Sequence, residues 1–229
     1  MNMNYEDYPK WKKWLTEESF AELSPLQCKK YESQLKKLGI AYSNINALEI
    51  GFGNGNFMKF LMNNGSRVEG VEIQEPLLNA AKAMGIAVHS SIDKIACGPY
   101  DLIVAFDVLE HLTVDELKSI FQKCRSSLKE NGVMFFRFPN ADSFVGMSSQ
   151  NGDYTHITAI GRSKLQQIIE PIGLRIEKFE SEDIYPKKVF INAVRWCFRY
   201  IFMRVMGVGN AYFFSGNVVA MIKVDKNAL

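Results

Sequence analysis

The strongest constraint on the fold is a regular alternation of short apolar segments and helical patterns along residues 46–138. Five segments read as strands: Asn46–Ile50, Arg67–Ile73, Ile86–Val88, Tyr100–Phe106 and Val133–Phe138. The fourth is strongly apolar, as expected of a strand that is buried on both faces of a sheet. Strands that alternate with helices of about 10–15 residues indicate βαβ units. We therefore predict a doubly wound α/β domain with a mostly parallel sheet.

Helix signals fill the spaces between these strands. Pro76 is placed to open a helix that runs through Met84. Thr113-Val-Asp-Glu116 matches a capping box before a helix to about Leu128, which Asn131-Gly132 is expected to end. Another helix is expected near Ser163–Glu170, and residues 5–38 read as a polar helical segment with interleaved aromatic residues. We expect residues 1–40 to form a helical cap on a domain that spans residues 41–186.

Three glycines follow the first strand at alternate positions, in Glu49-Ile-Gly51-Phe-Gly53-Asn-Gly55. Glycines let a backbone turn tightly and approach a ligand closely. The spacing is GxGxG, whereas dinucleotide-binding folds carry GxGxxG, which weakens an interpretation as an NAD-linked oxidoreductase. Glu72 ends the second strand, where a carboxylate can accept two hydrogen bonds from a ribose diol. A solvated charge at the strand end is the alternative for Glu72.

The segments "LEIGFGNG", "GVEI" and "FDVLEHL" occur in this order, each after a predicted strand. Over roughly residues 44–140, this combination resembles the class I S-adenosylmethionine-dependent methyltransferases. The resemblance implies S-adenosylmethionine as the cofactor and a Rossmann-like, seven-stranded sheet. It also implies that Ser215–Val224 forms the last, antiparallel strand, within a final segment of residues 215–229.

The same resemblance implies a role for individual residues. Glu49 and the glycine loop would contact the methionine part of the cofactor, Glu72 the ribose hydroxyls and Ile73 the adenine. Many relatives place an acid or an amide after the third strand, but this chain has serines there, so Ser91 or a backbone group is the expected adenine contact. His111 is either part of the site or a structural hydrogen-bonding group. The expected cofactor-binding set is Glu49, Gly51, Gly53, Gly55, Glu72, Ile73, Ser91, Ile92, Asp107 and His111.

A second stretch, "FPNADS…GDYTHITAIGRSKLQQIIEPIGL", resembles methyltransferases encoded with bacterial surface-polysaccharide pathways. A hydroxyl acceptor needs a base near neutral pH, which histidine supplies best. We expect His156 to be the general base and Asp153 to orient it or to bind the acceptor. The alternative is that both residues only hold a loop over the cofactor.

These observations favour an O-methyltransferase that acts on a sugar or sugar-linked group of a bacterial surface glycan or its precursor. A small phenolic or quinone-like acceptor is the alternative, because "DVLEHL" also occurs in that branch of the family. A non-catalytic cofactor-binding scaffold is a third hypothesis. The four cysteines have no metal-ligand spacing, so we predict no metal site and a reduced, cytoplasmic compartment. No nucleic-acid partner is expected.

The C-terminal part of the chain is basic and apolar. From Lys187 onward, seven basic residues face one acidic residue, although the whole chain has a net charge of only +2. Residues 187–214 are expected to form an extension in which Lys187–Met206 is a broadly apolar helix with a narrow polar stripe. Such a surface packs into the domain, meets a second subunit in a homodimer, or lies peripherally at the inner face of the membrane.

Overall fold

The computed structural model describes residues 20–95, 98–182, 197–198, 200–202, 204–205, 207 and 215–227. The predicted helical character of residues 5–19 lies outside these residues, as does most of the extension 187–214. The predicted packing of Lys187–Met206 therefore stays a prediction. Within the described part of the chain, no helix is long and apolar enough to cross a membrane.

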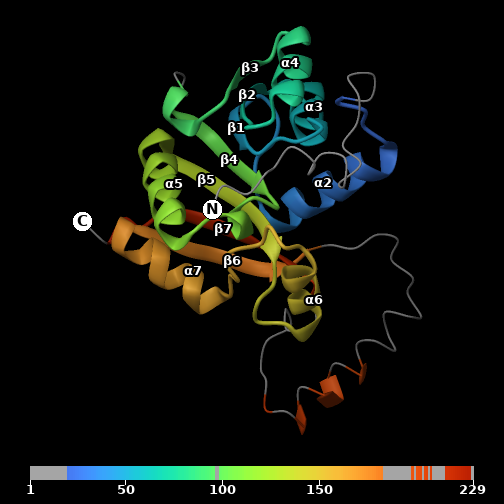
Figure 1. The fold of residues 1–229 in the computed structure, drawn as a ribbon, viewed down its shortest axis with the longest axis vertical. Coiled ribbons are helices and arrows are strands. Elements are labelled where there is room, and N and C mark those ends of the chain that lie inside the picture. The colour runs from blue at the N-terminus through green and yellow to red at the C-terminus, as the bar shows by residue number, and fades with distance from the viewer. Residues whose placement is uncertain are drawn as a thin grey trace.

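Seven strands form one sheet in the order β3-β2-β1-β4-β5-β7-β6 (Figure 1). They are β1 (Asn46–Ile50), β2 (Arg67–Val71), β3 (Ala87–His89), β4 (Tyr100–Phe106), β5 (Leu128–Pro139), β6 (Leu174–Ser181) and β7 (Asn217–Val224). The first five strands pair in parallel, and β7 is antiparallel to both of its neighbours, β5 and β6. The predicted seven-stranded, doubly wound sheet is confirmed.

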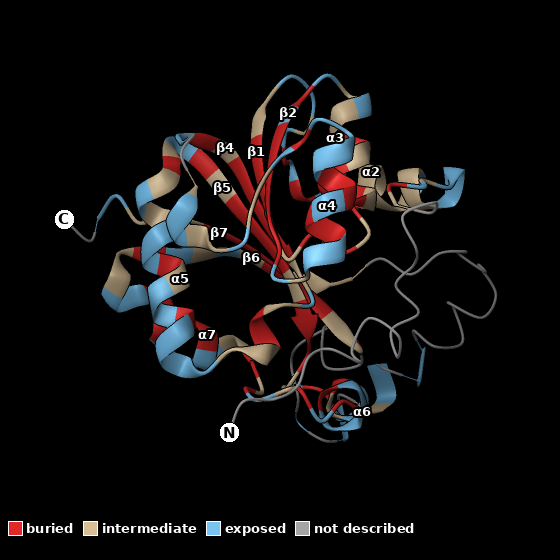
Figure 2. Cartoon of the chain, turned by 45° about the horizontal axis from the view of Figure 1, so that its top comes forward, coloured by how far each residue is buried: buried red, intermediate tan, exposed pale blue. Residues whose placement is uncertain are grey.

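Helices cover both faces of the sheet. They are α2 (Pro25–Leu38), α3 (Asn56–Asn63), α4 (Glu75–Ala83), α5 (Val114–Ser127), α6 (Phe144–Gly152) and α7 (Arg162–Ile169), with short 3₁₀ turns η3 (Ile92–Lys94), η4 (Leu109–His111) and η5 (Glu170–Ile172). Alternate residues of each strand face opposite sides. Leu48 therefore packs with α5 and α7, whereas Ala47 packs with α2, α3 and α4. The central strands β1, β2 and β4 are buried along most of their length (Figure 2), whereas the edge strands β3 and β6 are mostly not.

Several boundaries differ from the predicted ones by one or two residues, and two differ by more. The first described helix begins at Pro25 because Ser24 caps it: the Ser24 Oγ accepts from the backbone N–H of Gln27 at 3.2 Å. Strand β5 begins at Leu128, which pairs with Tyr100, so Asn131-Gly132 lies within the strand at a register shift and does not end a helix. Helix α6 was not predicted. The capping box of Thr113 and Glu116 is confirmed at the start of α5.

The order of the strands reverses at β1, which lies between β2 and β4. In doubly wound sheets, ligands bind in the crevice outside the carboxyl ends of the strands at such a reversal. The ends of β1 and β4 are Ile50 and Phe106, and the segments that follow both strands line the same pocket.

Candidate functional site

A pocket of about 1010 Å³ opens at the carboxyl ends of β1, β2 and β4. Ligand pockets commonly measure about 300–1,000 Å³, so this one has room for two small molecules side by side. Nine of the predicted site residues line it: Glu49, Gly51, Gly53, Glu72, Ile73, Ser91, Ile92, Asp107 and His111. The other three predicted site residues, Gly55, Asp153 and His156, are not among the described residues of the pocket wall.

The three glycines of the loop after β1 all have a left-handed backbone, with φ of 67° at Gly51, 49° at Gly53 and 68° at Gly55. Side chains are strained in this conformation, so the alternation of glycines is a requirement of the turn. A Cβ at Gly51 would overlap the side chain of Val108, and one at Gly55 would lie 2.5 Å from the ring of Phe20. Gly55 therefore serves the turn into α3 and the packing behind it, not the pocket wall.

Glu72 fixes the loop to the end of β2. Its Oε2 accepts from the backbone N–H of Gly53 at 3.1 Å, and its Oε1 accepts from those of Ile73 at 2.7 Å and Gln74 at 3.1 Å. Burial raises the pKa of Glu72, and these three backbone hydrogen bonds oppose the increase. Because the residue is only 5% exposed, the alternative of a solvated strand-end charge is wrong.

Glu49 is buried in the wall beside the glycine loop. Its Oε2 has no hydrogen-bond partner within the described structure, and burial holds the pKa of Glu49 well above its ordinary value. Tyr31 of α2 lines the same side, and its pKa is raised to about 12 by burial and by the charge of Glu49. A buried acceptor that lacks a partner in a pocket wall is suited to a donor from a ligand.

A network of ion pairs lies at the part of the pocket wall formed by the ends of β4 and β5. Arg137 of β5 pairs with Asp107 after β4, its Nε donating to Asp107 Oδ1 at 3.1 Å. Its Nη1 also donates to Glu182 Oε1 at 3.1 Å, and Glu182 in turn pairs with Lys30 of α2 at 2.7 Å. The guanidinium carbon lies 4.9 Å from the centroid of the Phe106 ring. The network thus joins the ends of β4, β5 and β6 to α2.

The turn after β3 also faces the pocket. Ser91 caps η3, its Oγ accepting from the backbone N–H of Asp93 at 3.2 Å. Asp93 itself lines the pocket and pairs with Lys123 of α5 at 3.0 Å. An acidic residue therefore lies in the pocket wall two residues beyond Ser91.

His111 and His156 have different positions although their rings meet edge to face, with centroids 4.7 Å apart. His111 lines the pocket, whereas the side chain of His156 is 6% exposed and lies behind it. The Nδ1 of His156 is 3.2 Å from the carbonyl oxygen of Gln150. Asp153 Oδ1 accepts from the hydroxyl of Thr155 at 2.6 Å. This arrangement fits the alternative in which His156 and Asp153 hold a loop.

The sequence model of one protein family, described as "Methyltransferase domain", matches residues 21–178. This match covers well over half of the chain and includes every strand from β1 to β5. The chain belongs to the methyltransferase domain family. Membership in this family favours an enzyme over the hypothesis of a non-catalytic scaffold.

Curated relatives of this methyltransferase fall in two groups. A ubiquinone biosynthesis O-methyltransferase from Marinobacter nauticus is 30% identical over 101 residues, which are 39% of this chain and 42% of that protein. An N-terminal Xaa-Pro-Lys N-methyltransferase 1-B from Xenopus laevis is 24% identical over 158 residues, 64% of this chain and 69% of that protein. The chain spans less than half the length of the ubiquinone relatives that it matches.

Solved structures share the fold of this methyltransferase. A SAM-dependent methyltransferase from Archaeoglobus fulgidus superposes with a TM-score of 0.64 at 20% identity, over 86% of this chain and 94% of that one. Magnesium protoporphyrin IX methyltransferase from Synechocystis, solved with bound SAH, gives a TM-score of 0.61 at 13% identity, over 97% and 96%. At these identities, the likeness establishes the fold alone.

Several residues of the methyltransferase's pocket were not predicted. Tyr31, Asp93 and Arg137 reach it from parts of the chain outside the glycine loop and the strand-end acids. The sequence does contain a signal for Arg137, because it is the one charged residue in the apolar segment Val133–Phe138. Ile157 also lines the pocket, although half of its surface is exposed.

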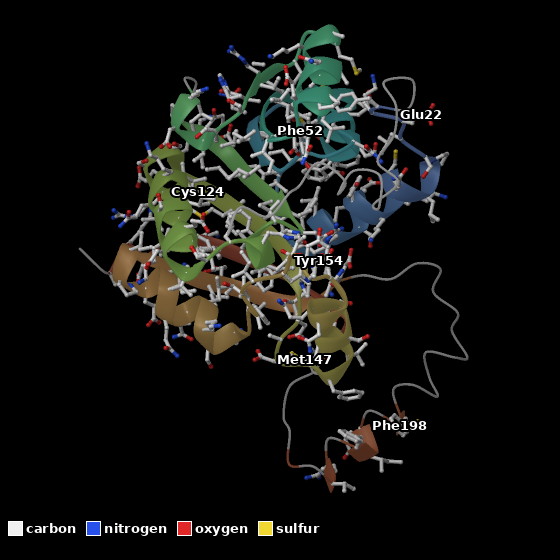
Figure 3. The ribbon with its side chains drawn as sticks, in the orientation of Figure 1. Glu22, Phe52, Cys124, Met147, Tyr154 and Phe198 are labelled. Atoms are coloured by element: carbon white, nitrogen blue, oxygen red, sulfur yellow. The ribbon has the colours of Figure 1, made fainter. Side chains whose placement is uncertain are left out.

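Four apolar residues of α6 and the loop after it have exposed side chains, and we call them the apolar rim. They are Phe144, Val145, Tyr154 and Ile157, which are 56%, 41%, 80% and 50% exposed. Figure 3 shows Tyr154 on the loop that follows α6, and Met147 on that helix. Phe144 also contacts Phe202 of the C-terminal extension, with ring centroids 6.2 Å apart. Of these four residues, Ile157 is the one among the described residues of the pocket wall.

Proposed function

We propose that this methyltransferase is an S-adenosylmethionine-dependent O-methyltransferase whose acceptor is a small phenolic or quinone-like molecule with an apolar part. One observation carries the proposal: one large pocket is lined by the glycine loop and two buried carboxylates, and also by a histidine, His111, and the exposed apolar residue Ile157. The first set of residues suits the cofactor and the second suits an acceptor.

The cofactor of this enzyme is S-adenosylmethionine, which when bound supplies a methyl group already activated on a sulfonium. Glu72 is placed to accept hydrogen bonds from the ribose diol, and the buried Oε2 of Glu49 suits the ammonium of the methionine part. The left-handed turn of the loop places Gly51 and Gly53 in the pocket wall. Ile73 and Ile92 offer apolar contacts to adenine, and Ser91 or Asp93 offers a polar one.

The acceptor side is formed by His111, Leu112 and Ile157. In methyl transfer, the enzyme contributes mainly by alignment, worth up to about 7–11 kcal/mol in favourable cases. A hydroxyl acceptor must also lose its proton, and His111 is the histidine on this wall that can assist the loss. We therefore assign to His111 the contact with the acceptor that the sequence suggested for His156. The ubiquinone O-methyltransferase relatives support a phenolic acceptor.

The glycan acceptor remains the second candidate, and its support is the resemblance of residues 138–174 to methyltransferases of surface-polysaccharide pathways. Cytoplasmic location, peripheral membrane contact and a homodimer through residues 187–206 also remain predictions. An acceptor panel decides between the two classes. We expect release of S-adenosylhomocysteine with catechols and prenylated phenols and none with sugars or nucleotide sugars. Turnover with a sugar, and none with any phenol, would reverse this assignment.

A matched pair of variants tests the place of the acceptor. We expect His111→Ala to lower turnover at least about a hundredfold while cofactor affinity stays nearly unchanged, because assistance to proton loss is typically worth 10²–10⁴-fold. The control is His89→Gln. His89 lies at the end of β3, paired with Glu69 at 2.6 Å, and is not among the described residues of the pocket wall. Full turnover in the His111 variant would place the acceptor elsewhere.

A further inference from the structure

Three side chains that could coordinate a metal ion meet beside the acceptor side of the pocket. Glu110 and His111 belong to η4, and His156 belongs to the loop between α6 and α7. One ligand atom of each residue lies within 4.8 Å of those of the other two. The loop is attached to η4 through the backbone, because the N–H groups of Ile157 and Thr158 donate to the Glu110 carbonyl at 2.8 and 3.0 Å. The cluster is therefore held by the fold.

Both histidines are oriented in the way that metal ligands require. The Nδ1 of His111 lies 3.1 Å from the carbonyl oxygen of Thr155, and that of His156 lies 3.2 Å from the carbonyl oxygen of Gln150. A carbonyl oxygen can only accept, so each Nδ1 carries the proton and each Nε2 presents a lone pair. Histidines that bind metals usually donate their other N–H to a carbonyl or carboxylate in this manner.

The spacing and the charge of the cluster also fit an ion. The Nε2 of His156 lies 3.9 Å from Glu110 Oε1 and 3.7 Å from Asp153 Oδ2, too far for hydrogen bonds. Ligands that share one ion through bonds of about 2.0–2.2 Å lie about 3–4.4 Å apart. The side chains of Glu110 and Asp153 are 2% and 6% exposed, and a divalent cation would neutralise these two buried carboxylates.

We propose that Glu110, His111 and His156 bind one first-row divalent cation such as Zn²⁺. Two imidazoles and one carboxylate are a common ligand set for such ions and leave a coordination position open. Asp153 contributes a second negative charge beside the ion. No spacing in the sequence indicated this site, because His156 follows His111 by 45 positions and only the attachment of the loop to η4 brings them together.

Because His111 also lines the pocket, an ion held by these residues would lie beside the acceptor side. This step rests on the proposed function. The acceptor hydroxyl binds the ion, which lowers its pKa, and its proton leaves to solvent water. The oxygen then forms a bond to the methyl carbon while the carbon–sulfur bond of the donor breaks, leaving a neutral thioether. His111 thus assists proton loss as a ligand of the ion.

The test begins with direct binding. The chain is stripped with a chelator and titrated with Zn²⁺ by calorimetry and with Co²⁺ by visible absorption. We expect one ion per chain, and at least about tenfold weaker binding in Glu110→Gln and in His156→Ala, since even the loss of an outer-shell partner costs about 10–100-fold. His89→Gln is the matched control, because it also removes a histidine that pairs with a buried carboxylate.

X-ray absorption of the Zn²⁺-loaded wild-type chain gives a second measurement that does not depend on how the variants fold. The expected spectrum contains the scattering of two imidazoles at about 2.0–2.1 Å. Absence of binding, or a bound ion without imidazole scattering, overturns the metal site. Either result leaves cofactor binding by the chain unaffected, so failure of the metal site and failure of the proposed function are distinguishable.

Discussion

At the residue scale, two buried glutamates at neighbouring strand ends have opposite surroundings. Glu72 accepts three backbone hydrogen bonds, so its negative charge is partly compensated by the fold itself. Glu49 is 3% exposed, and its Oε2 has no hydrogen-bond partner in the described structure. Burial raises the pKa of Glu49 and disfavours its ionised form, and the backbone hydrogen bond from Met58 and the charge of Arg137 offset this only in part. The chain therefore keeps at Glu49 a carboxylate whose ionisation costs stability, as expected of a group that serves a ligand.

This difference predicts how stability depends on pH. Because the pKa of Glu49 is raised by folding, its contribution is most favourable below the ordinary glutamate pKa and is lost as the pH rises through the folded pKa. Glu49→Gln should therefore raise the free energy of unfolding at pH 7 and leave it nearly unchanged at pH 4. Denaturant unfolding at both pH values measures this. A variant less stable than wild type at pH 7 contradicts the prediction.

The residues that sequence could and could not predict differ in how they reach the pocket. Glu72 and Gly53 lie directly after strands, so the strand pattern alone placed them. Tyr31 and Arg137 reach the pocket only because α2 and β5 pack beside β4, which no local pattern specifies. The burial of His156 behind His111 likewise follows from a loop attachment that the sequence does not reveal.

At the element scale, Arg137 joins segments that the sheet alone would hold together only at their backbones. It links the turn after β4 to the end of β6 through Asp107 and Glu182. Burial by itself would raise the pKa of Glu182, but the charges of Arg137 and Lys30 outweigh burial and lower it. The ion pairs of Arg137 with Asp107 and Glu182 therefore stabilise this part of the pocket wall while both carboxylates are ionised.

Arg137→Gln should lower the free energy of unfolding by about 1–3 kcal/mol, because it leaves Asp107 and Glu182 without their shared partner. The cost stays below that of a fully buried pair, since the side chain of Asp107 is 42% exposed. Urea denaturation measures it. Arg175→Gln is the control: Arg175 pairs with Glu177 at the surface of β6, and its loss should change stability by less than about 0.5 kcal/mol. Equal stabilities of the two variants would show that the network contributes nothing.

Elements with local signals were predicted, and elements set by packing were not. The capping box of Thr113 and Glu116 located α5 because its hydrogen bonds are local. Helix α6 has a capping residue, Ser143, but a weakly patterned sequence. The start of β5 at Leu128 depends on pairing with Tyr100 across a register shift, and such pairing is visible only in the assembled sheet.

At the scale of the whole molecule, one pocket is lined by residues from position 31 to position 157. Helix α2, the segments that follow β1, β2, β3 and β4, and the loop after α6 all contribute to it. A ligand that contacts all of them is bound by the folded chain and not by the unfolded one. Binding should therefore stabilise the entire domain and not a single loop.

Thermal unfolding gives the corresponding prediction. S-adenosylhomocysteine at a hundred times its Kd should stabilise the protein by about 2.7 kcal/mol. For a domain of this size, this corresponds to a rise in Tm of about 5–10 °C. NAD at the same concentration should leave Tm unchanged, because the loop glycines have the spacing GxGxG. Glu72→Ala should lose most of the shift relative to its own ligand-free Tm. Glu75→Ala should retain the shift, because Glu75 is exposed at the start of α4 and is not among the described residues of the pocket wall. A shift with NAD and none with S-adenosylhomocysteine would mean that the pocket has been assigned to the wrong cofactor.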